Sequence, residues 1–124
     1  MKFYTSNFRK SGRDPASVAI SLGVPKWYHK RHYLHLAPAA DMVHMTDEGE
    51  YRRRFARILE KLDVQEVARQ LGREAVLLCW EKEGEFCHRH LVADWLRAAG
   101  HEVEEVKDVY RGDEPADPGL FDSV

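Results

Sequence analysis

The stretch Ala75–Lys107, AVLLCWEKEGEFCHRHLVADWLRAAGHEVEEVK, holds the pattern that decides the fold. Residues 75–80 form a continuous apolar run, which is typical of a short strand buried on both faces. Residues 88–99 repeat apolar side chains at helical spacing, and Gly100 suits the end of that helix. Residues 102–107 indicate an edge strand. This order predicts a strand–helix–strand unit whose strands run parallel.

Shorter elements precede this unit. Residues 2–6 and 18–22 indicate two further strands. The segments 7–17 and 23–40 are rich in Gly, Pro, Ser and Asp, which predicts that they are largely loop. Two helices are expected after this loop. Asp47 and Asp63 are each followed three residues later by glutamate, which is the capping-box pattern of a helix start, and Gly72 suits the end of the second helix.

These elements predict one α/β domain over residues 1–111, with a small, mostly parallel sheet flanked by helices and a Rossmann-like βαβ unit in its C-terminal half. The chain has 124 residues, 44% of them hydrophobic, which suits one ordinary core. No apolar run approaches the roughly 20 residues that span a bilayer, and Met1 begins no signal-peptide pattern. We therefore expect a soluble cytoplasmic protein without a membrane partner. Residues 112–124 predict an acidic, flexible tail.

The net charge of −2 gives no global positive field for nucleic-acid binding. Two local basic stretches, Lys26–Tyr33 and Arg52–Arg54, nevertheless leave a nucleic-acid or protein contact open. Charge runs such as Arg52–Arg54 most often form a solvated helix face.

Both cysteines of the chain lie at the junction between the apolar strand and its helix. Cys79, Trp80 and Glu81 end the strand, whereas Cys87, His88 and Arg89 begin the helix. Ligands of open α/β sheets bind at the carboxyl ends of the strands. A helix N-terminus beside a cation also lowers the pKa of a cysteine. The junction is therefore predicted to be a site.

Four interpretations of this junction stay open. It could form a catalytic or ligand-binding pocket with Cys87, His88 and Arg89 at its floor. Both cysteines could instead be small buried hydrophobes, with His88 and Arg89 paired to Glu81 or Glu83. A metal site is disfavoured, because residues 80–86 separate the cysteines by more than the usual zinc spacing. A redox disulfide between Cys79 and Cys87 depends on geometry alone.

The run Leu77–Glu81 followed by Cys87–Arg89 resembles the signature of the DUF488 family, a strand ending in Leu-Cys-x-Glu and a helix opening on Cys-His-Arg. The resemblance to the shorter members of that family extends upstream, to Tyr4–Phe8, Val18–Ser21, Pro25 and Tyr33–Pro38. It therefore covers about residues 2–107. Longer members carry Asp-Val-Arg after the second strand, where this chain has Ala19–Leu22. The resemblance implies a shared site and no particular reaction.

We expect an enzyme or ligand-binding protein that takes a small anionic ligand, such as a nucleotide or phosphate ester, since a helix N-terminus favours anions. The expected catalytic residues are Glu81, Cys87, His88 and Arg89, with Cys87 as nucleophile or anion-site donor and Glu81 as the acid–base group or as the partner that orients Arg89. The expected ligand-binding residues are Ser6, Asn7, Tyr33, Cys79 and Trp80. Neither a metal nor a cofactor is expected. The alternative is a non-catalytic nucleic-acid-associated or protein-interaction module in which Cys-His-Arg is structural.

Overall fold

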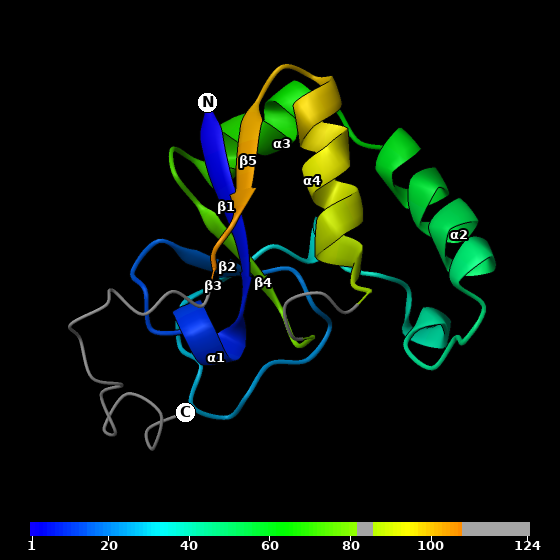
Figure 1. Ribbon diagram of the computed structural model, residues 1–124, viewed down its shortest axis with the longest axis horizontal. Coiled ribbons are helices and arrows are strands. Elements are labelled where there is room, and N and C mark those ends of the chain that lie inside the picture. Colours follow the sequence, from blue (N-terminus) through cyan, green and yellow to red (C-terminus); the bar gives the residue numbers. More distant parts are fainter. Residues whose placement is uncertain (82–85, 108–124) are drawn as a thin grey trace.

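Strand β4 (Val76–Cys79) is the central strand of a five-stranded sheet with the order β3-β2-β4-β1-β5 (Figure 1). The computed structural model describes residues 1–81 and 86–107. The other strands are β1 (Lys2–Asn7), β2 (Ser17–Ala19), β3 (Arg31–His32) and β5 (Glu102–Glu105). All pairings between them are parallel, which confirms the predicted α/β class.

Side chains of β4 alternate between two apolar clusters, one on each face of the sheet. Leu77 packs in the larger cluster, which also contains apolar residues of α2, α3 and α4. Val76 and Leu78 pack in the smaller cluster with Phe8 and Tyr28. Both faces of the strand are thus covered, and this accounts for the unbroken apolar run that the sequence shows.

The helices are α1 (Phe8–Ser11), α2 (Glu48–Glu60), α3 (Val64–Leu71) and α4 (His88–Ala98), with 3-10 turns at Leu34–Leu36 and Ala40–Met42. Asp47 caps α2 by accepting a hydrogen bond from the Glu50 amide at 3.0 Å. Asp63 caps α3 in the same way, and Gly72 ends that helix with a φ of 84°. The three long helices begin where the sequence predicts.

The connection from β4 through α4 to β5 is the predicted parallel crossover, but β1 lies between the two strands. In β1, Tyr4 is in register with Val76 of β4 and Phe3 with Val103 of β5. The N-terminal strand therefore lies between the central strand β4 and the edge strand β5. Helix α4 covers the sheet on one side, and α2 packs outside it (Figure 1).

Three details differ from the sequence prediction. The segment 7–17, expected to be loop, contains α1, because Asn7 caps it by accepting a hydrogen bond from the Lys10 amide at 2.9 Å. The segment 23–40 contains the short strand β3. Strand β2 ends at Ala19 rather than at residue 22.

In the described parts of the chain, no helix is long and apolar enough to cross a membrane. The predicted acidic tail, residues 112–124, and the suggested partner Glu83 lie outside those parts.

Candidate functional site

A pocket of about 530 Å³ opens at the carboxyl end of β4. It lies between the end of the central strand, the start of α4 and the chain that leads into α2. Its walls are formed by Ser21, Leu22, Gly23, Pro38, Met42, Val43, Met45, Tyr51, Cys79, Trp80, Glu81, Phe86, Cys87 and His88. Five of the predicted site residues therefore meet at one pocket: Cys79, Trp80, Glu81, Cys87 and His88.

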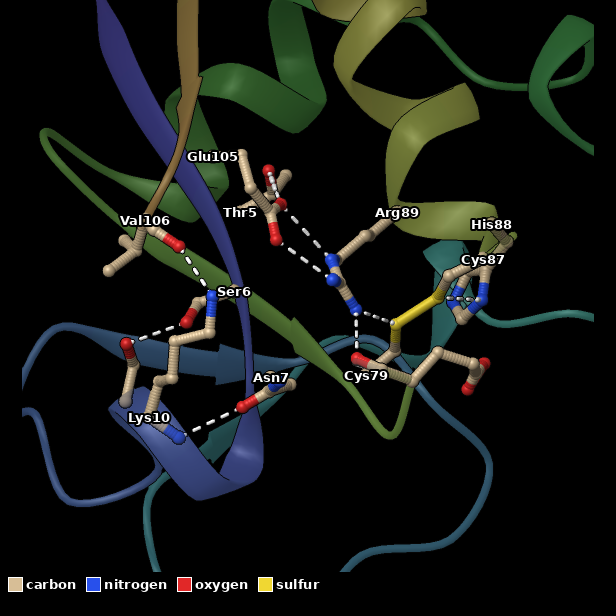
Figure 2. A network of polar contacts seen from close by, with 12 residues as sticks. Thr5, Ser6, Asn7, Lys10, Cys79, Cys87, His88, Arg89, Glu105 and Val106 are labelled. Atoms are coloured by element: carbon tan, nitrogen blue, oxygen red, sulfur yellow. Dashed lines mark hydrogen bonds and ion pairs between the residues drawn. A yellow bond between two sulfur atoms is a disulfide. The ribbon is translucent and has the colours of Figure 1, made fainter. Parts of the chain in front are cut away.

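Cys79 and Cys87 form a disulfide in the wall of this pocket (Figure 2). Both side chains are buried. Cys87 is also the N-cap residue of α4, with extended backbone, and its side chain makes no capping hydrogen bond. The disulfide that one interpretation of the sequence raised is thus present, at a helix N-terminus whose first amides are not capped by that side chain.

His88 is held in one orientation by a backbone carbonyl. Its Nε2 lies 2.6 Å from the carbonyl oxygen of Ile20, and its Nδ1 lies 3.7 Å from Sγ of Cys87. A carbonyl oxygen only accepts, so Nε2 carries the proton and Nδ1 presents a lone pair to the sulfur. Burial lowers the pKa of His88 to about 4. The imidazole is therefore neutral at neutral pH.

Arg89 lies beside the disulfide, next to the sulfur of Cys79, and is completely buried (Figure 2). Its Nε and Nη2 donate to the two carboxylate oxygens of Glu105, at 3.1 and 2.8 Å. Its Nη1 donates to Sγ of Cys79 at 3.0 Å and to the carbonyl oxygen of Glu81 at 2.8 Å. The guanidinium is therefore paired with Glu105, and Arg89 is absent from the pocket walls.

Glu105 was not identified from the sequence. It lies in β5, the edge strand that follows α4, and Thr5 of β1 donates to it at 2.6 Å. No local motif marks this residue, because its partners come from two distant segments. Its carboxylate fixes the side chain of Arg89, which in turn contacts Cys79.

Glu81 and Trp80 line the pocket beside an aromatic wall. Burial, and secondarily the negative charge of Glu81, raises the pKa of Tyr51 to about 12. The ring of Tyr51 meets that of Phe86 edge to face, with centroids 5.2 Å apart. Trp80 donates through Nε1 to the carbonyl oxygen of Gly23 at 2.9 Å. Among the described residues, the site thus combines one carboxylate with an apolar surface that includes the rings of Tyr51, Trp80 and Phe86.

Ser6, Asn7 and Tyr33 lie away from the pocket walls. Ser6 is in register with Leu78, and its hydroxyl lies 2.7 Å from that of Ser11 in α1. Asn7 caps α1, and the hydroxyl of Tyr33 donates to Gln70. Strand alternation explains the place of Ser6, since neighbouring side chains of a strand point to opposite faces.

The basic stretches make local contacts. Arg53 and Arg54 form ion pairs with Glu50 and Asp41, both at 2.8 Å. Arg31 donates to the carbonyl oxygens at the end of α3. In the folded chain these arginines therefore contact neighbouring carboxylates and helix carbonyl oxygens.

The pocket wall formed by residues 38–45 was not predicted either. Pro38 comes from the segment 23–40, which the sequence predicts to be largely loop. Met42 and Met45 come from the residues between that loop and α2, for which the sequence predicts no helix or strand. Tyr51 belongs to α2, which was predicted without any link to the site. Only tertiary packing brings these residues to the junction, and no spacing in the sequence signals them.

Together, the fold and this pocket define a small parallel α/β domain with paired cysteines and a histidine at the carboxyl end of its central strand. The chain belongs to the DUF488 family: the model DUF488-N3a, described as the active DUF488-N3 subclade, matches residues 9–100. The family resemblance of the two motifs is thereby confirmed. No curated protein and no solved structure matches the chain.

Proposed function

We propose that this DUF488 protein is an enzyme, or an enzyme-like binding protein, that acts on a small anionic ligand in the pocket through Cys87 and His88. One observation carries the proposal. The lone pair of His88 Nδ1 faces Sγ of Cys87 at 3.7 Å, while Ile20 holds the opposite nitrogen at 2.6 Å. A nucleophile, a base and a group that orients the base are the parts of an activated thiol.

The chemistry requires the reduced protein. A thiol or phosphine reductant would donate two electrons to the disulfide and give two thiols. The Cys87 proton can then pass to Nδ1 of His88, leaving a thiolate at the N-cap of α4. The partial positive charge of that helix end favours the thiolate. A reducing compartment such as the cytoplasm suits this function.

The ligand proposed is small, anionic and in part planar. Tyr51, Trp80 and Phe86 provide aromatic walls, and the α4 amides provide a place for an anionic group. Glu81 would exchange a proton with the ligand or orient it. Arg89 is a positioning residue in this scheme, because it contacts Cys79 and the backbone of Glu81 while Glu105 balances its charge.

The experiment measures alkylation of Cys87 by iodoacetamide against pH, in reduced, metal-free protein carrying Cys79→Ser so that one thiol remains. We expect an apparent thiol pKa below the free value of about 8.5. Adding His88→Gln should raise it, whereas the exposed His29→Gln should leave it unchanged. Inorganic phosphate or adenosine monophosphate should slow the reaction if it occupies the pocket. A thiol pKa at or above the free value would contradict the nucleophile role.

A second candidate function rests on a different surface. Lys26, His29 and Lys30 are exposed, next to the exposed strand β3. We propose an oligonucleotide contact here as the alternative, with Cys-His-Arg serving only to anchor α4. Binding that weakens steeply with salt would support this function, and no binding at low salt would remove it.

A further inference from the structure

Three metal-binding atoms converge in the pocket wall. The ligand atoms of Cys79, Cys87 and His88 all lie within 4.8 Å of one another, and all three side chains are buried. The chain has only two cysteines, and both are in this group. Figure 2 shows the imidazole of His88 beside the two sulfurs.

The spacing of these atoms suits one tetrahedral ion. With zinc–sulfur and zinc–nitrogen bonds of about 2.3 and 2.0–2.1 Å, a sulfur and a nitrogen ligand lie about 3.6 Å apart. The distance between His88 Nδ1 and Cys87 Sγ is 3.7 Å. The Cα atoms of Cys79 and Cys87 are 7.4 Å apart, wider than the roughly 4.4–6.8 Å usual for disulfides. The backbone thus leaves room for two sulfurs that separate around an ion.

The surroundings of the three atoms resemble the support that metal ligands require. A metal-bound histidine normally donates its other N–H to a carbonyl or carboxylate, and His88 does so to Ile20. A donor to a ligating sulfur fixes its position and favours the thiolate. Arg89, held by Glu105, already donates to Sγ of Cys79.

We propose that Cys79, Cys87 and His88 of the reduced protein bind one divalent transition-metal ion, with zinc the best match to two thiolates and an imidazole. The fourth position would face the pocket, because all three residues line it. Three protein ligands and one open position are the arrangement of catalytic zinc sites.

The inference rests on one part of the proposed function, the small anionic ligand in the pocket, and gives Cys87 a different role toward it. Among the described residues, the pocket walls contain Glu81 but no lysine or arginine, and Arg89 is paired with Glu105. An ion with an open position would supply a Lewis acid that takes an oxygen of the anionic ligand. With the ion bound, Cys87 is a ligand rather than a nucleophile.

Metal binding requires reduction of the disulfide followed by release of the two thiol protons. A thiol reductant provides the two electrons and two protons that convert the disulfide to two thiols and becomes a disulfide itself. A phosphine provides the two electrons and becomes a phosphine oxide, while water provides the oxygen and the two protons. Binding of the ion then displaces both thiol protons into solvent, and His88 contributes its Nδ1 lone pair. No other reactant is needed.

The experiment titrates the reduced full-length chain with zinc, in competition with a chromophoric chelator of known affinity. We expect one ion per chain. Cobalt(II) in place of zinc should give thiolate-to-cobalt charge-transfer absorption and the intense visible bands of a tetrahedral site. Cys79→Ser, Cys87→Ser and His88→Ala should each weaken zinc binding by more than about 100-fold, since loss of an outer partner alone costs 10–100-fold.

His29→Ala is the matched control, because it removes an exposed histidine and should leave the affinity unchanged. The wild-type stoichiometry and cobalt spectrum decide the question even if a variant fails to fold. Absence of tight zinc binding, or a cobalt spectrum without thiolate absorption, overturns the inference. If zinc fails to bind and Cys87 is still a low-pKa thiol, only the metal proposal fails. If zinc binds but neither phosphate nor adenosine monophosphate perturbs the cobalt spectrum or slows alkylation, the anionic-ligand proposal fails instead.

Discussion

Replacing Arg89 with methionine should destabilise the fold severely, because this change leaves a carboxylate without its partner. Arg89 is 0% exposed, and the side chain of Glu105 is 19% exposed. Removing one member of a buried ion pair costs roughly 3–5 kcal/mol. Since Glu105 keeps some contact with solvent, we expect a loss of about 3 kcal/mol, near the lower limit of that range.

Urea unfolding followed by circular dichroism measures this loss. A domain of this size has a stability of about 5–15 kcal/mol and a urea dependence of about 1–3 kcal/mol per molar. The midpoint should therefore fall by roughly 1–3 M. Arg53→Met is the matched control, because its pair with Glu50 is exposed and its removal should not change the midpoint measurably.

A double variant separates the ion pair from other effects of the arginine. Arg89→Met combined with Glu105→Leu removes both charges, so it should be more stable than Arg89→Met alone. An unchanged midpoint in Arg89→Met would refute the reasoning. If that variant kept its stability but lost affinity for phosphate, Arg89 would be a direct ligand contact instead of a positioning residue.

Two further predictions concern His88 and Asp63. The pKa of His88 is about 4 in the folded chain and 6.5 in the unfolded chain. Between pH 6.5 and 4, therefore, the imidazole is protonated in the unfolded chain but not in the folded one. Stability should thus fall as pH falls from 6.5 to 4, by about 3 kcal/mol at most. In the disulfide-bonded protein, the unfolding free energy of wild type relative to His88→Gln should decline over this range; a constant difference would argue against a buried neutral imidazole. Asp63→Ala should cost about 1 kcal/mol in thermal unfolding because two α3 amides lose their cap, while Asp63→Asn should stay close to wild type.

Local signals in the sequence were sufficient for most of the elements. The apolar run before Cys79, the aspartate caps of α2 and α3 and the glycine after α3 each act within a few residues. Helix α1 and strand β3 were missed for the opposite reason. Each is short, and each depends on contacts that the local pattern does not show, such as the pairing of β3 with β2.

The candidate site was predictable only in part. Cys79, Glu81, Cys87 and His88 come from one strand–loop–helix junction, so their proximity follows from the chain itself. Ser6 is the last residue but one of the adjacent strand β1, but its register with Leu78 turns its hydroxyl toward α1. A sequence shows which residues end a strand, whereas the face that each one occupies at the site depends on the pairing register.

The sequence alone therefore determined the parallel α/β class, the main helix boundaries, the DUF488 signature and the strand–helix junction that carries the candidate residues, because each depends on periodicity or spacing along the chain. The tertiary structure decided which side chains share the pocket. It placed β1 between β4 and β5, paired Arg89 with Glu105 and turned His88 Nδ1 toward Cys87. Those contacts join segments far apart in sequence, and only the packed sheet and helices fix their geometry.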